Sequence, residues 1–137
     1  MAEFPNVHNE VGVAVTHFLV VEDIQRSLDF YSKLGAEVLR DEMPAVVQWG
    51  SGWLTLNPGG EPTPDKPEVE LVTPEDSNRV SSFLNLWVDD LDRIYREWSD
   101  LGVEFLTAPK DFGHEKRAYF RDPDGHLVEV GERRFAE

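Results

Sequence analysis

Residues 21–39 read VEDIQRSLDFYSKLGAEVL, and a second version of this stretch, VDDLDRIYREWSDLGVEFL, occupies residues 88–106. The two align without a gap at a constant offset of 67 positions, and 8 of the 19 aligned residues are identical. Such an internal repeat is typical of one supersecondary unit used twice, where neither copy buries its apolar surface alone. The sequence therefore predicts a single domain made of two similar modules.

Each copy of the repeat predicts a helix. Asp23 and Asp90 stand where the N-cap of a helix belongs, and apolar residues follow each of them at helical spacing. Gly35 and Gly102 end the two helices, because glycine readily adopts the positive φ that often follows a helix.

Short runs rich in β-branched and aromatic residues surround both helices and predict strands. These runs cover residues 13–21, 37–40, 45–49 and 53–57, and then 82–88, 104–106, 116–121 and 126–132. A glycine-containing turn separates the last two strands of each module, with GSG at residues 50–52 and DPDG at residues 122–125. Both modules thus have the order βαβββ, which places the chain in the α+β class.

A segment rich in proline and glycine joins the modules. Residues 58–80 contain five prolines and the pair Gly59-Gly60, a composition typical of a linker. The expected organisation is an N-terminal extension at residues 1–11, a first module at 12–57, the linker at 58–80 and a second module at 81–137.

Composition narrows the choice of partners. The formal net charge is −14 and the pI is near 4.5, so we expect no nucleic-acid partner, because phosphate contacts require clustered Lys and Arg. The absence of cysteine excludes disulfides and thiolate chemistry. No apolar run is long enough to span a membrane, and the first residues lack the features of a signal peptide. A cytoplasmic location without a membrane partner is therefore expected.

Two motifs resemble a known family. Residues 21–35 follow the pattern V-x-D-I-x-x-S-L-x-F-Y-x-x-L-G, and residues 120–129 read FRDPDGHLVE. On a βαβββ repeat these motifs resemble the vicinal oxygen chelate superfamily, which includes glyoxalase I, extradiol dioxygenases, fosfomycin-resistance enzymes and bleomycin-resistance proteins. The resemblance covers about residues 12–132 and implies paired modules whose sheets curl into an open barrel around a pocket. It also implies a homodimer, because family members often complete their barrels across a two-fold axis.

The resemblance further implies where a metal would bind. Enzymes of the family hold one divalent metal with His and Glu side chains that point into the barrel. The matching positions in this chain are Thr16, Thr55, Phe83 and Glu129. Only Glu129 carries a metal-binding side chain, and one carboxylate does not make a tight transition-metal site. We therefore expect no metal cofactor, as in the bleomycin-resistance branch, which residues 95–99 (YREWS) also resemble.

His17 leaves a metal-dependent alternative open. It lies one position after Thr16, so regular strand alternation turns its side chain to the opposite face, toward the helix. A β-bulge would bring it into the pocket. In that alternative, His17 and Glu129 hold one divalent transition metal, and the protein is a lyase or dioxygenase of the same superfamily.

Strand alternation, started from the ligand positions that the resemblance implies, also predicts the pocket lining. The expected ligand-binding side chains are Phe18, Trp53, Thr55, Phe83, Asn85, Trp87 and Glu129. Apolar walls with a few convergent polar groups are typical of a small-molecule site, and Trp and Phe faces suit planar or cationic ligands. The leading hypothesis is therefore metal-free binding of an aromatic or cationic small molecule, such as an antibiotic or another natural product.

A further hypothesis is a metal-independent enzyme, for which the resemblance implies a lyase, isomerase or dioxygenase. Glu129 or His114 would then act as general base, because His114 lies in a loop that borders the pocket mouth in family members. His126 follows the DPDG turn and is expected to be exposed, and His8 lies in the N-terminal extension.

Overall fold

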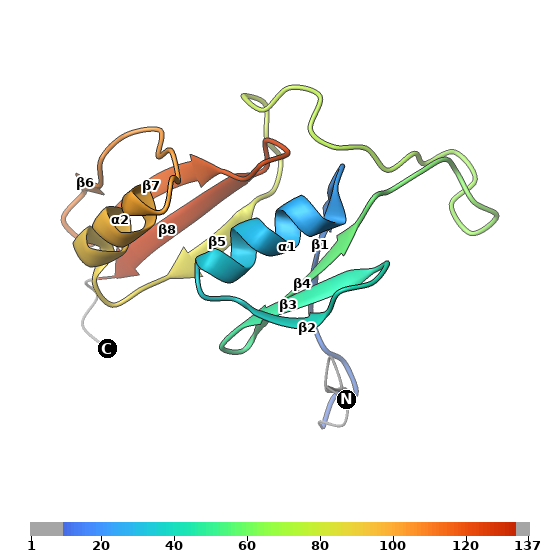
Figure 1. Cartoon of the computed structure of the whole chain (residues 1–137), viewed down its shortest axis with the longest axis horizontal. Helices are drawn as coiled ribbons and strands as arrows, with labels where there is room; N and C mark the ends of the chain where they lie inside the picture. The colour runs from blue at the N-terminus through green and yellow to red at the C-terminus, as the bar shows by residue number, and fades with distance from the viewer. Residues whose placement is uncertain (1–9, 134–137) are drawn as a thin grey trace. The chain divides into compact units, whose positions relative to one another are not determined.

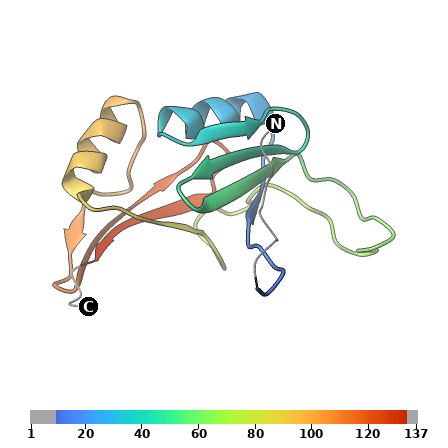
Figure 2. The same cartoon turned by 90° about the horizontal axis from the view of Figure 1, so that it is seen from below.

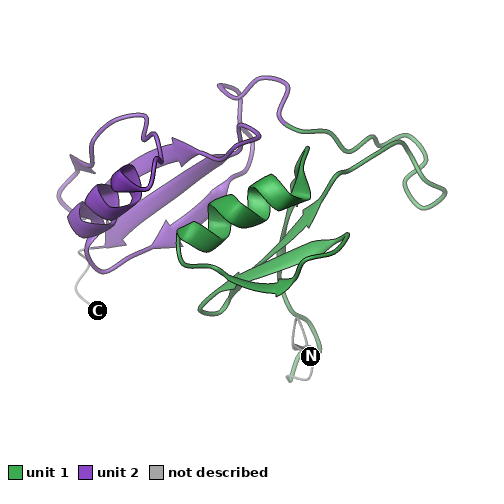
Figure 3. Cartoon of the chain, viewed as in Figure 1, with its two compact units in different colours: residues 1–73 green, residues 74–137 purple. Residues whose placement is uncertain are grey.

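The computed structural model describes residues 10–133 and divides into two compact units, residues 1–73 and residues 74–137 (Figures 1 and 3). Each unit holds one open four-stranded sheet and one helix, which confirms the predicted α+β class with tandem βαβββ modules. The predicted linker divides between the units, with residues 58–73 in the first and 74–80 in the second. Most of the expected N-terminal extension, including His8, lies outside the described residues.

The first unit contains β1 (His17–Val20), α1 (Ile24–Lys33), β2 (Glu37–Arg40), β3 (Ala45–Trp49) and β4 (Gly52–Asn57). Its strands lie in the order β1-β4-β3-β2, with β1 parallel to β4 and the other neighbours antiparallel. α1 lies along one side of this sheet (Figure 2). The core of the unit therefore sits between α1 and the sheet.

α1 begins and ends where the sequence predicts. The side chain of Asp23 accepts a hydrogen bond of 3.1 Å from the backbone N–H of Arg26, and Gly35 takes a φ of +103° just after the helix. Leu28 and Tyr31 face the sheet and are buried. Burial of a leucine side chain contributes about 1.5–3 kcal/mol, which holds the helix on the sheet.

The second unit contains β5 (Leu84–Trp87), α2 (Leu91–Asp100), β6 (Lys110–Asp111), β7 (Glu115–Arg121) and β8 (Leu127–Arg133). The order is β5-β8-β7-β6, with β5 parallel to β8 and the other neighbours antiparallel. Trp98 of α2 meets Phe120 of β7 edge to face, with ring centroids 5.8 Å apart. This contact anchors α2 to one side of the sheet, where Phe120 is fully buried.

The first predicted strand is shorter than expected. Residues 13–21 were expected to form it, but β1 covers only His17–Val20. His17 pairs with Leu54, and β4 begins only two residues earlier, at Gly52. At the same register, Val15 and Thr16 would still lie opposite β4, while residues 13 and 14 would lie beyond its start, so the ladder could not reach Val13.

The strand predicted at residues 104–106 is wrong. The structure reduces it to a single bridge between Phe105 and Phe120, and β6 takes the place of a longer partner. The outer edge of β7 is shared, since Phe105 pairs near one end of it and β6 pairs with Lys116 and Arg117 near the other. Neither short segment has room to extend along the whole edge.

Among the described residues, no helix combines the length and the apolar character needed to cross a membrane. Both α1 and α2 contain 10 residues.

Candidate functional site

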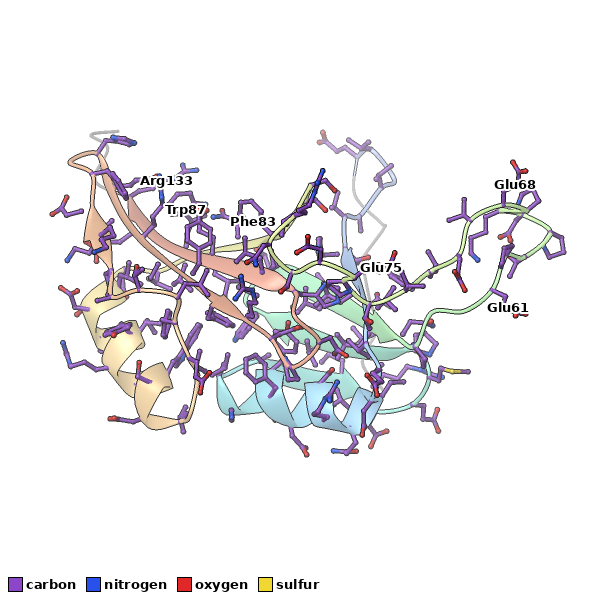
Figure 4. The ribbon with its side chains drawn as sticks, turned by 90° about the horizontal axis from the view of Figure 1, so that it is seen from above. Glu61, Glu68, Glu75, Phe83, Trp87 and Arg133 are labelled. Atoms are coloured by element: carbon purple, nitrogen blue, oxygen red, sulfur yellow. The ribbon has the colours of Figure 1, made fainter. Side chains whose placement is uncertain are left out.

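The second sheet has one side covered by α2 and an opposite side without a helix of its own unit. Strand alternation turns Phe120, Val128 and Val130 toward α2, and all three are fully buried. We call the opposite side the open face; it carries Phe83, Asn85, Trp87, Glu115, Arg117, Tyr119, Arg121, Leu127, Glu129, Gly131 and Arg133. Figure 4 shows Phe83 and Trp87 on the side of the sheet away from α2, with Arg133 beside Trp87.

Glu129 lies at the centre of the open face and is held from both neighbouring strands. The hydroxyl of Tyr119 donates a hydrogen bond of 2.5 Å to Oε2, and the side-chain amide of Asn85 donates to Oε1. The ladder places both donors directly opposite Glu129, Asn85 on β5 and Tyr119 on β7. Both carboxylate oxygens therefore accept a bond, and the group has one defined orientation.

Tyr119 is a neutral donor in this cluster. Burial first, and then the hydrogen bond to Glu129, raise the pKa of Tyr119 from 10.0 to about 12. The phenol therefore stays protonated across the physiological pH range. Its ring also meets the ring of Phe83 edge to face, with centroids 6.0 Å apart.

Two aromatic rings, one on β5 and one just before it, flank the Glu129 cluster and remain accessible. Phe83 is 40% exposed and Trp87 is 44% exposed. The indole of Trp87 lies over Gly131, since a Cβ added there would come within 2.7 Å of the ring. The guanidinium of Arg133 lies over the same indole, 4.1 Å from the ring centroid. Trp87 thus already binds a cation of its own chain.

Arg117 adds a second cation near the Trp87 end of the open face. It pairs with Gly131 in the ladder and donates from Nη1 to Glu115 at 2.6 Å. This bond, more than the negative charge of nearby Glu129, raises the pKa of Arg117 above its ordinary value. Its guanidinium also lies over the ring of Phe112, 4.2 Å from the centroid.

The predicted ligand-binding residues of the first module lie on the side of their own sheet that faces away from α1. Phe18 pairs with Thr55 in the ladder, and alternation places Trp53 on the same side. Phe18 is exposed, while Trp53 and Thr55 are half-buried. These three residues belong to the first unit, so the structure groups the predicted residues into one set per unit.

His17 follows regular strand alternation. The pairing of β1 with β4 runs without a break from His17 to Val20. His17 therefore shares a face with the buried Leu19 and lies opposite the face of Phe18. No bulge occurs within β1, so the strand does not turn His17 toward the predicted ligand positions.

The residues present do not fit a tight transition-metal site. Among residues 10–133, no three His, Asp or Glu side chains come close enough together to hold a metal ion. Thr16 precedes β1, Thr55 offers only a hydroxyl, and Phe83 offers an aromatic edge beside Tyr119. The one suitable donor, Glu129, has both oxygens engaged by Asn85 and Tyr119.

The remaining histidines lie away from Glu129. His114 is exposed in the loop between β6 and β7, five residues before Tyr119, which corresponds to about 16 Å along an extended strand. His126 lies in the turn between β7 and β8, where its backbone N–H donates to Asp122 at 2.9 Å. The structure therefore does not join His114 and Glu129 into one acid–base pair.

Sequence reasoning missed several residues of the open face, among them Arg117, Tyr119 and Arg133. The alternating pattern EKRAYFR at residues 115–121 carried the signal for Arg117 and Tyr119, because every second residue of β7 shares a face. Assigning that face required the register between β7 and β8, which pairs Tyr119 with Glu129.

Comparisons with known proteins agree with this fold. The chain is 28% identical over 114 residues to Metallothiol transferase FosB of Shouchella clausii. The aligned region covers 80% of this chain and 73% of the relative. A glyoxalase/bleomycin resistance protein/dioxygenase structure from Nocardioides has a TM-score of 0.69 at 20% identity, covering 100% of this chain and 89% of that one. Fosfomycin Resistance Protein FosX of Mesorhizobium loti has a TM-score of 0.66 at 17% identity, covering 90% and 93%.

The sequence model of one family spans nearly the whole chain, matching residues 13–130. These residues include both helices, the DPDG turn and the Glu129 cluster. The chain belongs to the Glyoxalase/Bleomycin resistance protein/Dioxygenase superfamily.

Proposed function

We propose that this protein binds a planar, cationic aromatic small molecule on the open face of its second module, without a metal. The observation that carries the proposal is the Glu129 carboxylate, oriented by Tyr119 and Asn85 between the exposed rings of Phe83 and Trp87. An antibiotic or another natural product is the kind of ligand that fits this description.

The aromatic rings and the carboxylate favour the same kind of ligand. A planar ring stacks on Trp or Phe, and a positive charge over such a ring gains about 0.5–2 kcal/mol. Arg133 already occupies this kind of position over Trp87, which supports the choice of a cation. A ligand cation that also reaches Glu129 gains a charge-assisted hydrogen bond.

Metal-free recognition accounts for the neighbours of Glu129. A metal site would surround this carboxylate with further His or carboxylate ligands, but its neighbours are an amide, a phenol and an aromatic ring. Fosfomycin resistance is part of the name of one protein with a similar fold, FosX. This name supports the proposal that the ligand of the present chain is a small molecule.

Calorimetric titration with a matched pair of acridines tests the proposal. At pH 8, 9-aminoacridine is a planar cation and acridine is its neutral counterpart. We expect the wild type to bind the cation at least about tenfold more tightly, and Glu129→Gln to remove that preference while keeping the shape of the side chain. Equal binding of the two compounds by the wild type, or no binding of either, would contradict the proposal.

Glu68→Gln is the matched control. Glu68 is an exposed carboxylate on a loop of the first unit (Figure 4). Glu68→Gln changes the net charge of the chain by the same amount as Glu129→Gln. A similar loss of preference in both variants would attribute the effect to overall charge and not to the open face.

A further inference from the structure

The open face carries opposite charges on the two sides of one aromatic ring. Along β8, alternation places Glu129, Gly131 and Arg133 on this face in succession. The Trp87 ring lies over Gly131, so it occupies the space between the carboxylate and the guanidinium. Arg133 follows Glu129 by four positions along the strand, which corresponds to about 13 Å between their Cα atoms.

Arg133 is positioned to bind an anion as well as to stack. Its guanidinium meets the Trp87 ring at 4.1 Å. A guanidinium that stacks by its face presents its N–H donors in the plane of the group, where a carboxylate can accept two of them. A planar ligand placed on the Trp87 side of the face therefore meets these donors at its edge.

The net charge of the open face is opposite in sign to the net charge of the whole chain. The open face holds three arginines, Arg117, Arg121 and Arg133, against two glutamates, Glu115 and Glu129. The whole chain carries a formal net charge of −14. At the Arg117–Arg133 end of this face two arginines stand against one glutamate, Glu115, so an acidic group on a ligand meets one positive charge in excess there.

We propose that the ligand of the open face is a zwitterion: a planar aromatic ring with a basic group that pairs with Glu129 and an acidic group that pairs with Arg133. Arg133 is then a specificity-determining residue. It competes with a purely cationic ligand for Trp87, and it forms an additional ion pair with a ligand that also carries an acidic group. This inference rests on the proposed function, since it takes the same face as the binding site.

The two charges also set the orientation of the ligand. The basic group points toward the Phe83 end of the face and the acidic group toward the Arg117 end, with the ring against the part of the Trp87 indole that remains exposed beside Arg133. A neutral or singly charged ring satisfies only one of these contacts, so charge selects the ligand more strongly than ring size does.

Four acridines share one ring system and differ in charge, so their affinities measure the effect of each charged group on binding. Acridine is neutral at pH 8, 9-aminoacridine is a cation, acridine-4-carboxylate is an anion and 9-aminoacridine-4-carboxylate is a zwitterion. Calorimetry on the full chain should show the zwitterion binding at least about tenfold more tightly than the cation. In Arg133→Gln this advantage should disappear, while the cation binds as well as before or better because Trp87 is released.

Two further variants separate charge from structure. Arg133→Lys keeps the positive charge and should retain part of the advantage of the zwitterion. Arg96→Gln removes an exposed arginine from α2 and should change none of the affinities. Loss of the advantage in Arg96→Gln, or its survival in Arg133→Gln, would overturn the assignment of Arg133.

The outcomes distinguish this inference from the proposed function. If the cation binds in a Glu129-dependent way but the added carboxylate brings no gain, the zwitterion assignment fails and the proposed function stands. If none of the four acridines binds, both fail.

Discussion

At the scale of single residues, the site depends on how Tyr119 and Asn85 restrain Glu129. The two donors come from different strands, so they fix the carboxylate in one orientation on the open face. A carboxylate that is already ordered loses little conformational entropy when a cation binds to it. The aromatic rings beside it add contact area without long flexible side chains.

The raised pKa of Tyr119 makes the contribution of this residue to stability depend on pH. The pKa is about 12 in the folded chain against 10.0 for an ordinary tyrosine side chain. A raised folded pKa means that the stabilisation is fully present below the unfolded value and is lost as pH rises through the folded value. Urea unfolding should therefore show the wild type losing its advantage over Tyr119→Phe between about pH 10 and about pH 12.

A difference between wild type and Tyr119→Phe that stays constant over this range would contradict the raised pKa. Tyrosinate absorbance during an alkaline titration provides an independent check. The wild type should show one late-titrating phenol that Tyr119→Phe lacks.

Gly131→Ala should weaken ligand binding more than it weakens the fold. The new Cβ would lie 2.7 Å from the Trp87 ring, so the ring must move from its place over β8. Because Trp87 is 44% exposed, it can move at a cost in unfolding free energy of about 1 kcal/mol or less. Urea unfolding and titration with 9-aminoacridine, measured on the same sample, should show nearly unchanged stability and at least about tenfold weaker binding.

Gly59→Ala provides the contrast for that variant. At Gly59 the added Cβ would lie 2.4 Å from the backbone oxygen of Leu71, and the φ of +78° already disfavours a side chain. Backbone cannot move aside as a surface ring can. Gly59→Ala should therefore destabilise the first unit more than Gly131→Ala destabilises the second, and the reverse order would contradict this interpretation.

At the scale of secondary-structure elements, the DPDG turn joins β7 to β8 and so sets which residues face Glu129. Asp122 is 5% exposed, and its carboxylate accepts backbone hydrogen bonds from Asp124 at 3.0 Å and His126 at 2.9 Å. Gly125 follows with a φ of +92°. These contacts close the turn in one conformation and pair Arg121 with Leu127.

Asp122→Ala should destabilise the chain by about 1–3 kcal/mol, because two partly buried N–H groups lose their acceptor. Urea unfolding measures this loss. Asp41→Ala, at an exposed position, should change the unfolding free energy by no more than about 0.5 kcal/mol. Equal effects of the two substitutions would show that the turn does not depend on the Asp122 contacts.

At the scale of the whole molecule, the proposed function predicts a protein that purifies without a metal. Elemental analysis of protein prepared without chelators or an affinity tag should find less than about one tenth of an equivalent of transition metal per chain. A stoichiometric metal that is lost in Glu129→Gln would overturn metal-free binding and favour the lyase or dioxygenase alternative.

The resemblance to the superfamily predicts a homodimer. Two copies with a formal charge of −14 each repel one another, so we expect added salt to strengthen the association. Sedimentation at micromolar concentration, at low and at physiological salt, measures this. A single species of 15.6 kDa under both conditions would contradict the prediction.

The sequence predicted the helices and the residues of one sheet face, but it did not predict all the contacts of the candidate site. Asp23, Gly35 and Asp90 marked the helices correctly, because caps and glycine turns act on residues close in sequence. Alternation, started from the ligand positions that the family resemblance implies, placed Phe83, Asn85, Trp87 and Glu129 on one face, and they share that face in the structure. The barrel that would join both modules remains a prediction.

The sequence by itself determined the repeat, the two helices and the alternation within each strand, since all of these depend on neighbours a few residues away. The tertiary structure decided where strands end and which side chains meet across them. β1 begins only at His17, opposite Leu54 near the start of β4, and Tyr119 reaches Glu129 because β7 lies beside β8 in the sheet. Register and strand order arise from contacts between distant segments, so a pattern within one strand does not contain them.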